Sequence, residues 1–525
     1  MTPDRAAANS VKSPSLHCLA VAFLGLIIVF HLGSAWSNKA FLRASHLGTA
    51  LEYARGRIDL LHPVIAGFNA TGTPTAQELP LWQAAAAMAF KVAHSTWYGW
   101  ANVVSLLLFA TCLWPFFQLA RHYTGDRVAW WATILFLAQP IIIIMAGEAA
   151  ADGFCLVSTI WFLFFADKMI RTGSGWLLLP ATAFACLAAV LKLPFFMAAG
   201  LGSLGLLFVN HVRAWRPWLL LAGAGALAML ALGLWSRHAD ALAAQAEFPY
   251  YELRFSQNPN LVQWYFGDLH SRLSPGLWLK GGWRFLHATL GSPPLIGLLL
   301  FGLLRPGNLM PKVWLLGGVL TTLVFTTGVL NHWHYFLMYC PAVALLCGSV
   351  LARWENSWFE EFPWPRLVLP IAGLVLALSA VEGLITMKIS IDYDSFPRKI
   401  SSLLREHTNP NDRLIVLGES TWGGEVLFRS GRKGLSVYSL EPPRAGPKQK
   451  GLAEILGSDE HLGRLKSLGY NKLVLLSESP VRFAVQAVNP GSQRQRLFYP
   501  ETISKTVDSW PVVYRSEDIL IREIP

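Results

Sequence analysis

Charged residues are scarce in this sequence. Asp, Glu, Lys and Arg make up 14% of its 525 residues, whereas hydrophobic residues make up 53%. A soluble protein usually carries about 25% charged residues, so a single soluble globular domain is excluded. Apolar runs recur between residues 15 and 385, and a run of roughly 20 apolar residues is enough to cross a bilayer as a helix. The sequence therefore predicts a polytopic α-helical membrane protein.

Cysteine is also scarce and is absent from the last part of the chain. All six cysteines lie in or beside apolar runs, none follows residue 387, and no Cys-x-x-Cys pair occurs. This pattern indicates neither a disulfide framework nor a zinc site. The formal charge of +11 is not arranged as a basic stripe with interleaved aromatic residues, so no nucleic-acid partner is expected.

The apolar runs predict about eleven transmembrane helices. The first contains an apolar stretch after Arg5 and Lys12 and is interpreted as an uncleaved helix, because many further runs follow it. The expected helices lie near residues 17–35, 99–119, 128–146, 153–170, 175–191, 194–210, 217–235, 288–304, 313–330, 335–352 and 366–385.

The basic residues are distributed unequally between the short connections that join these runs. The connections 147–152 and 331–334 contain neither Lys nor Arg, whereas the connections on the opposite side contain many. The positive-inside rule makes the basic connections cytoplasmic. We therefore expect a cell (inner) membrane protein with its N-terminus inside and its C-terminal part periplasmic or extracellular. The basic residues concerned are Arg121, Arg127, Lys168, Arg171, Arg213, Arg216, Arg305, Lys312, Arg353 and Arg366.

Two domains are expected. Residues 1–387 form a transmembrane domain with long outer loops at 37–97 and 236–286, and residues 388–525 form a soluble domain outside. The second loop is rich in aromatic residues, which settle at the headgroup level of a bilayer. The C-terminal domain is predicted to be α/β, because strand-like runs at 413–417, 472–476 and 518–521 flank a helical segment at 459–468.

The ionisable residues near the membrane gather on its outer side, at the ends of the expected helices or, for Glu78, in the first outer loop. Such residues are costly in a bilayer and are often functional, although each has an ordinary alternative role. Asp152 is suited to capping a helix, Lys192 to reaching the interface, and the remaining side chains to contact with water. The residues concerned are Glu78, Glu148, Asp152, Lys192, His332 and His334.

Convergence on one side of the membrane favours a chemical role. A carboxylate can act as general base towards an acceptor hydroxyl or amine. Cationic side chains can bind a phosphate leaving group and stabilise its developing charge. Together these groups suit glycosyl transfer from a lipid phosphate.

Several short motifs resemble those of the glycosyltransferase family 39 membrane enzymes (dolichyl-phosphate-mannose protein mannosyltransferase-like). These enzymes belong to the GT-C superfamily, as does the aminoarabinose transferase of lipid A. The resemblance runs over residues 15–350. It is carried by Arg43-Ala-Ser-His46, Leu61-His-Pro63, Glu78-Leu-Pro-Leu-Trp-Gln83, Ala146–Asp152, Leu191-Lys-Leu-Pro194 and Asn331-His-Trp-His-Tyr335, and Arg429–Gly434 is similar to a stretch in bacterial members.

The resemblance implies a GT-C-like fold and an inverting transfer from a polyprenyl-phosphate sugar donor at the outer face. It implies Glu78, Asp152 and Glu148 as catalytic carboxylates, and Lys192, His332, Tyr335, Arg43 and His46 as groups that bind donor phosphate or sugar.

The sequence also departs from the family. Many members carry an Asp-Glu pair just after the first helix, whereas residues 37–46 contain no acid. The carboxylates left in the first outer loop are Glu52, Asp59 and Glu78, and Glu78 is favoured because its surroundings match the family motif.

Two other functions stay open. One is a transporter or lipid flippase, which requires polar residues at mid-membrane. The other is a catalytically silent scaffold, which the missing Asp-Glu pair favours. The expected partners of an enzyme are a polyprenyl-phosphate sugar donor, a cell-envelope glycan, lipid or protein acceptor, and membrane lipids. No cofactor or metal site is expected from the residue pattern, and a divalent metal requirement stays open.

Overall fold

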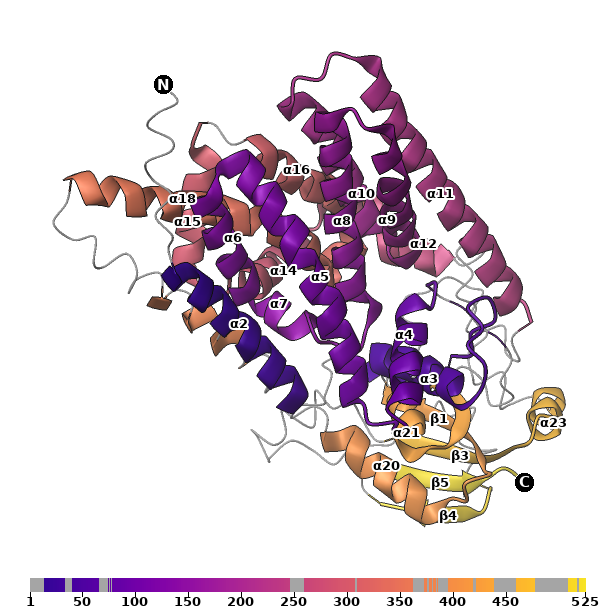
Figure 1. Cartoon of the computed structure of the whole chain (residues 1–525). Helices are drawn as coiled ribbons and strands as arrows, with labels where there is room; N and C mark the ends of the chain where they lie inside the picture. The colour runs from indigo at the N-terminus through magenta and orange to yellow at the C-terminus, as the bar shows by residue number, and fades with distance from the viewer. Residues whose placement is uncertain are drawn as a thin grey trace.

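Helices form most of the protein, and a small sheet lies at one end (Figure 1). The computed structural model describes residues 14–33, 40–65, 74, 76, 78–245, 259–306, 309–361, 373–374, 377–379, 381–383, 385, 395–418, 422–438, 459–476, 509–516 and 519–525. The expected helix at 366–385 and the expected boundary at 387/388 fall largely or wholly outside these residues.

The helical part confirms the predicted membrane class. Four described helices are long and apolar enough to cross a membrane, and a bent pair adds a fifth, so the count of eleven is not confirmed. The four are α5 (Gly99–Thr124), α8 (Ala151–Thr172), α11 (Trp215–Ala243) and the Trp333–Glu355 part of η4 (Trp333–Tyr339) and α18 (Cys340–Glu361). Shorter apolar helices lie in α2 (Pro14–Gly33), η1 (Gly175–Leu177) with α9 (Leu178–Leu191), α10 (Leu193–Val209) and α16 (Leu309–Val324).

Proline interrupts some runs that the sequence predicts as single helices. The run at 128–146 is divided into α6 (Asp126–Ala138) and α7 (Pro140–Met145), with Gln139 extended between them. Pro140 has no N–H to continue the α6 hydrogen-bond pattern. The run at 288–304 contains, near its start, a bend of 97° between Pro275–Leu290 and Pro293–Leu304. These segments comprise α14 (Pro275–Phe285), the π-helical η3 (Leu286–Leu290) and α15 (Pro293–Leu304).

Small residues bring the helices of the bundle close together. A methyl group at Gly348 of α18 would collide with the backbone of Ala132 in α6, and one at Gly317 of α16 would collide with the carbonyl of Ala198 in α10. In a membrane, where lipid tails are as apolar as leucine, such backbone approach is a main source of helix association. These contacts fix the helix ends that carry the candidate site.

The described part of segment 37–97, which was predicted to be an outer loop, contains two helices that pack against each other, α3 (Ala40–Arg55) and α4 (Leu81–Val92). Figure 1 shows them between the helical bundle and the sheet. The indole N–H of Trp82 donates a 2.9 Å hydrogen bond to Ser105 of α5, and Lys91 donates to the carbonyl of Gly56. The loop is therefore attached both to the bundle and to its own returning chain.

The C-terminal part confirms the predicted α/β sheet. Its five strands lie in the order β2-β1-β3-β5-β4, with β1 parallel to β2 and β3, and β5 antiparallel to β3 and β4. The elements are α20 (Ser395–His407), β1 (Arg413–Gly418), α21 (Trp422–Ser430), β2 (Lys433–Tyr438), α23 (Asp459–Ser467), β3 (Tyr470–Leu476), β4 (Val512–Arg515) and β5 (Ile519–Glu523).

The sheet docks on the outer loop of the bundle. Helix α21 packs against α3, and the ring centroids of Phe428 and Tyr98 are 5.5 Å apart. The sheet and the helices α3 and α4 therefore share one end of the bundle.

Candidate functional site

Glu78 lies just before α4 and points towards α3. Its Oε1 is 2.9 Å from His46 Nε2, and the two side chains are 15% and 2% exposed. The Gln83 amide lies 3.0 Å from His46 Nδ1. Because a carboxylate only accepts hydrogen bonds, Nε2 of His46 donates to Glu78, and Nδ1 faces the Gln83 amide. Gln83 thus positions the His46 ring, and His46 orients the Glu78 carboxylate.

Asp152 lies in the first turn of α8 and is fully buried. Its Oδ1 is 3.1 Å from Lys192 Nζ and 3.7 Å from His334 Nε2. The N-cap residue of α8 is Ala150, which excludes the capping role suggested for Asp152. A carboxylate in the first turn is also stabilised by the helix dipole.

Lys192 is the single residue between α9 and α10, and its backbone is extended. Pro194 follows in the first turn of α10, and since proline cannot donate a backbone hydrogen bond, α9 cannot continue through it. The break turns the lysine side chain towards α8. Lys192 interacts electrostatically with Asp152, Glu78, Tyr335 and Tyr265, and its Nζ is 5.5 Å from the centre of the Tyr335 ring.

The charges at this site affect each other. Burial raises the pKa of Glu78, but the positive charges of His46 and Lys192 outweigh this effect and lower the pKa below its usual value. Glu78 is therefore ionised at neutral pH. The negative charge of Asp152 repels the Glu78 carboxylate. Lys192 interacts with both carboxylates, and its positive charge offsets this repulsion.

Five of the predicted site residues are thus brought together: Glu78, His46, Asp152, Lys192 and Tyr335. Of the others, His332 is adjacent, since its ring centroid is 5.7 Å from that of His334. Arg43 lies in α3, but its side chain is outside the described residues. Its predicted role stays a prediction.

Glu148 does not share a helical face with Asp152, because residues 146–150 precede the start of α8 and are not helical. Its side chain is 2% exposed, and its backbone carbonyl accepts a hydrogen bond from Ser105. This position ties the start of α8 to α5.

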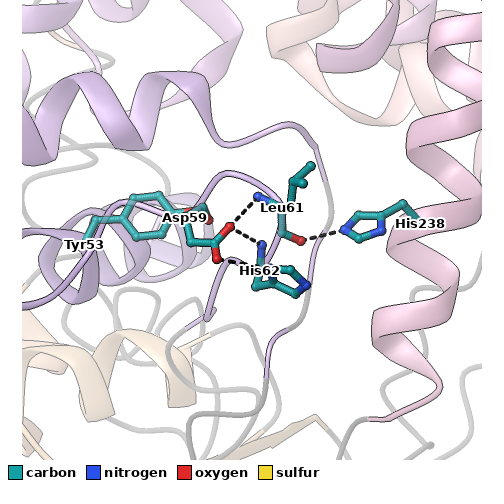
Figure 2. Close-up of polar contacts among 5 residues, drawn as sticks. All are labelled: Tyr53, Asp59, Leu61, His62 and His238. Atoms are coloured by element: carbon teal, nitrogen blue, oxygen red, sulfur yellow. Dashed lines mark hydrogen bonds and ion pairs between the residues drawn. The ribbon is translucent and has the colours of Figure 1, made fainter.

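The other two carboxylates of the first outer loop have local partners. Figure 2 shows Asp59 accepting hydrogen bonds from the backbone amides of Leu61 and His62 and contacting the His62 ring. These bonds, the Leu61 amide first, lower the pKa of Asp59. His238 of α11 donates to the Leu61 carbonyl (Figure 2), so Asp59 shapes a turn that docks on α11. Glu52 forms an exposed pair with Arg55.

No chemical role was predicted for two residues of the site. Tyr265, in α12 (Pro259–Phe266), hydrogen-bonds to Tyr335 and interacts with Lys192 and both carboxylates. It was expected only as an interfacial aromatic residue of the loop 236–286. Gln83 is the last residue of the motif Glu78–Gln83, but its spacing did not predict the contact of its side chain with His46.

The arginines of the segment Arg429–Gly434 form contacts within the C-terminal part of the protein. Arg429 forms a buried ion pair with Glu425 in the preceding turn of α21. Arg432 donates to the hydroxyl and carbonyl oxygens of Thr408 at the end of α20. These bonds tie α20 and α21 to the edge of the sheet. Among the described residues, no cluster of three or more His, Cys, Asp or Glu side chains is arranged to hold a metal ion.

The chain shares its fold with solved structures of the GT-C superfamily.

Two of these structures are of ArnT, the lipid A aminoarabinose transferase, from Cupriavidus metallidurans. The form bound to undecaprenyl phosphate matches with a TM-score of 0.57 and 15% identity, over 98% of both chains. The apo form matches with a TM-score of 0.59 and 14% identity, over 98% of this chain and 99% of ArnT. The apo oligosaccharyltransferase of Archaeoglobus fulgidus matches with a TM-score of 0.48 and 10% identity, over 89% and 70%. No family model and no curated protein matches the sequence.

Proposed function

We propose that this protein is an inverting membrane glycosyltransferase. It moves a sugar from a polyprenyl-phosphate donor to a cell-envelope glycan, lipid or protein at the outer face of the cell (inner) membrane. In this proposal the N-terminus is cytoplasmic and the C-terminal domain, residues 388–525, is outside.

One observation carries the proposal: Lys192 interacts with two carboxylates from different parts of the chain, the fully buried Asp152 and the partly buried Glu78. It contacts Asp152 at 3.1 Å and interacts electrostatically with Glu78. The fold similarity to ArnT, one structure of which holds undecaprenyl phosphate, supports a lipid-phosphate donor.

The two carboxylates suit different tasks. Glu78 is the more exposed and is oriented by His46, which suits a general base that an acceptor must reach. Asp152 is fully buried against Lys192 and His334, which suits a residue that positions the cation. Because a lysine ammonium is a compact point charge, Lys192 so positioned can bind a phosphate oxygen.

The proposed transfer is a single displacement at the anomeric carbon of the donor sugar. Glu78 takes the proton of the acceptor hydroxyl or amine as its oxygen or nitrogen forms a bond to the anomeric carbon. The bond between that carbon and the phosphate oxygen breaks on the opposite face, and its electron pair stays on the phosphate. Lys192 stabilises the negative charge that develops there. One displacement of this kind inverts the anomeric centre.

The experiment uses the full chain reconstituted in lipid vesicles with undecaprenyl phosphate carrying a labelled hexose or pentose. Membranes from an envelope-containing cell supply the acceptor. We expect labelled acceptor and free undecaprenyl phosphate to form together, and Glu78→Gln and Lys192→Met to abolish both. Full activity in both variants would overturn the site.

The two other functions predict different results. A transporter or flippase would move the lipid or a solute across sealed vesicles without cleaving the sugar from its phosphate. A silent scaffold would show neither reaction in the wild-type protein. The proximity of Glu78, Asp152 and Lys192 favours the transferase, because a scaffold has no need to bury two carboxylates around one lysine.

A further inference from the structure

A pocket lies between α5 and α8, far from the candidate site. Its volume is about 460 Å³. Aromatic rings line one part, and basic and polar side chains line the rest. The lining residues are Trp114, Gln118, Arg121, His122, Phe164, Lys168 and Arg171.

The two helices present the same series of side chains to this pocket. On α5 an aromatic ring at Trp114 is followed four residues later by Gln118 and seven residues later by Arg121. On α8 Phe164 is followed at the same spacings by Lys168 and Arg171. Residues at i, i+4 and i+7 share one helix face. The arginines therefore lie about 10 Å along the helices from the aromatic rings.

The aromatic end of the pocket is apolar and accessible. The rings of Trp114 and Phe164 contact each other, with centroids 5.0 Å apart, and Trp114 is 53% exposed. Trp161 extends this wall, since its ring centroid is 5.9 Å from that of Trp114. Because this wall lies about 10 Å further along the membrane-crossing helices than the arginines, it lies at the depth of the acyl chains next to the headgroups.

The basic end of the pocket keeps a net positive charge among the described residues, because its three cations Arg121, Lys168 and Arg171 face two carboxylates. Arg171 donates through Nε to Asp167, which is fully buried and also accepts from Tyr123. This bond fixes the guanidinium through one of its nitrogens. Arg121 pairs with Asp126 at the exposed surface. Lys168 forms no ion pair with any described carboxylate, and its Nζ is 5.9 Å from the Phe164 ring.

The pocket lies one membrane thickness from the candidate site. Asp152 stands in the first turn of α8 and Arg171 in its last turn. The 19 residue steps from Asp152 to Arg171 span about 28 Å at 1.5 Å per step. The hydrocarbon core of a bilayer is about 30 Å thick, so the pocket lies at the opposite leaflet, which the positive-inside rule assigns to the cytoplasm.

We propose that this pocket binds an anionic phospholipid of the cytoplasmic leaflet. The headgroup phosphate lies among Arg121, Lys168 and Arg171, and an acyl chain lies along Trp114 and Phe164. Basic pockets between transmembrane helices on the cytoplasmic side suit anionic headgroups. The aromatic wall at the depth of the acyl chains favours a lipid over a soluble phosphate, which has no apolar part to place there.

Native mass spectrometry of the full-length protein tests the proposal. The probes are dioleoyl phosphatidylglycerol and dioleoyl phosphatidylcholine, which share acyl chains and differ in net charge. We expect phosphatidylglycerol to bind at least tenfold more tightly. The double variant Arg121→Gln with Lys168→Gln should lose roughly fivefold in affinity for each charge removed, with phosphatidylcholine binding unchanged. Arg171 is left intact because it neutralises the buried Asp167.

The matched control is Arg213→Gln with Arg216→Gln, which removes two exposed basic residues outside the pocket. This variant should bind phosphatidylglycerol as the wild type does. Equal loss in both double variants would overturn the proposal, because attraction would then be a general surface effect. Equal binding of the two lipids by the wild type would also overturn it. Displacement of bound phosphatidylglycerol by equimolar glycerol 3-phosphate would identify a soluble-phosphate site instead of a lipid site.

Discussion

Lys192 Nζ lies 3.1 Å from Asp152 Oδ1, although 40 residues separate them in the chain. The pair joins the start of α8 to the break between α9 and α10. Asp152 is fully buried and the Lys192 side chain is 10% exposed. A buried pair of this kind positions the lysine ammonium. Each of its two charges is also stabilised in the protein interior by the other.

This dependence predicts a large loss of stability when one partner is removed. Asp152→Ala should lower the free energy of unfolding by about 3–5 kcal/mol, because it leaves a buried ammonium without its counter-charge. Asp152→Ala combined with Lys192→Met should recover part of that loss. Denaturant unfolding of the detergent-solubilised protein measures both. Glu52→Gln, which breaks an exposed pair with Arg55, serves as the control and should cost less than about 1 kcal/mol.

A double variant no more stable than Asp152→Ala alone would contradict this account. It would mean that Lys192 is stabilised mainly by its other neighbours, Glu78 and the two tyrosines.

Glu78 is predicted to be the base that the transfer requires. Glu78→Gln should lower kcat by roughly 10²–10⁴-fold, which is the usual contribution of a positioned general base. The substitution keeps the size of the side chain and removes its charge. Release of undecaprenyl phosphate from the labelled donor is the measurement.

Asp59→Asn provides the matched control, since it changes another carboxylate of the same loop. An asparagine oxygen can still accept from the Leu61 and His62 amides (Figure 2), so the turn and the activity should persist. Equal loss in both variants would show that the loop, and not the base, had been disturbed.

His46 sets the acidity of Glu78 and therefore the pH dependence of transfer. The positive charges of His46 and Lys192 lower the pKa of Glu78, so wild-type activity should fall only at pH values below the usual range of a glutamate. In His46→Gln one of these charges is absent, the pKa of Glu78 rises, and the acidic limb of kcat/KM should move to higher pH. A pH–rate profile from pH 3.5 to 8 detects this shift.

His62→Gln is the control for the removal of a loop histidine, because His62 is exposed and contacts Asp59 instead of Glu78. Its profile should match that of the wild type. An unchanged acidic limb in His46→Gln would mean that another group limits the rate at low pH.

The membrane class and the strands of the C-terminal domain could be predicted because each depends on local patterns. The run Lys472–Leu476 forms most of β3, and the run Arg413–Leu417 forms most of β1. The helix ends were less predictable. Pro140 divides one expected span, but whether a proline bends a helix or ends it depends on the surrounding packing.

The site was predictable as a set of residues but not as a set of contacts. Polar residues at helix ends pointed to Glu78, Asp152 and Lys192, since charge at such positions is rare. Sequence could not show that Lys192 would pair with Asp152, because that contact depends on the angle between α9 and α10. Nor could it distinguish Asp59 from Glu78, which differ in the partners that the folded loop provides.

Gly434 is predicted to be essential for the sheet of the C-terminal domain. It lies on β2 opposite Leu414 of β1, and an added methyl group would collide with the Leu414 carbonyl and approach the Leu427 side chain. The Leu414 carbonyl belongs to β1, which is paired on both sides, and cannot move aside, so Gly434→Ala should destabilise the domain by about 1–3 kcal/mol. Gly463→Ala is the control. It should stabilise the domain, because Gly463 is exposed in α23 with nothing within 4 Å and alanine favours a helix by about 0.5–1 kcal/mol.

Limited proteolysis of the full-length protein, followed at the C-terminal domain, compares the two variants. Faster cleavage of Gly434→Ala and unchanged or slower cleavage of Gly463→Ala are expected, and equal rates would show that β2 is not packed as closely on β1 as the structure indicates.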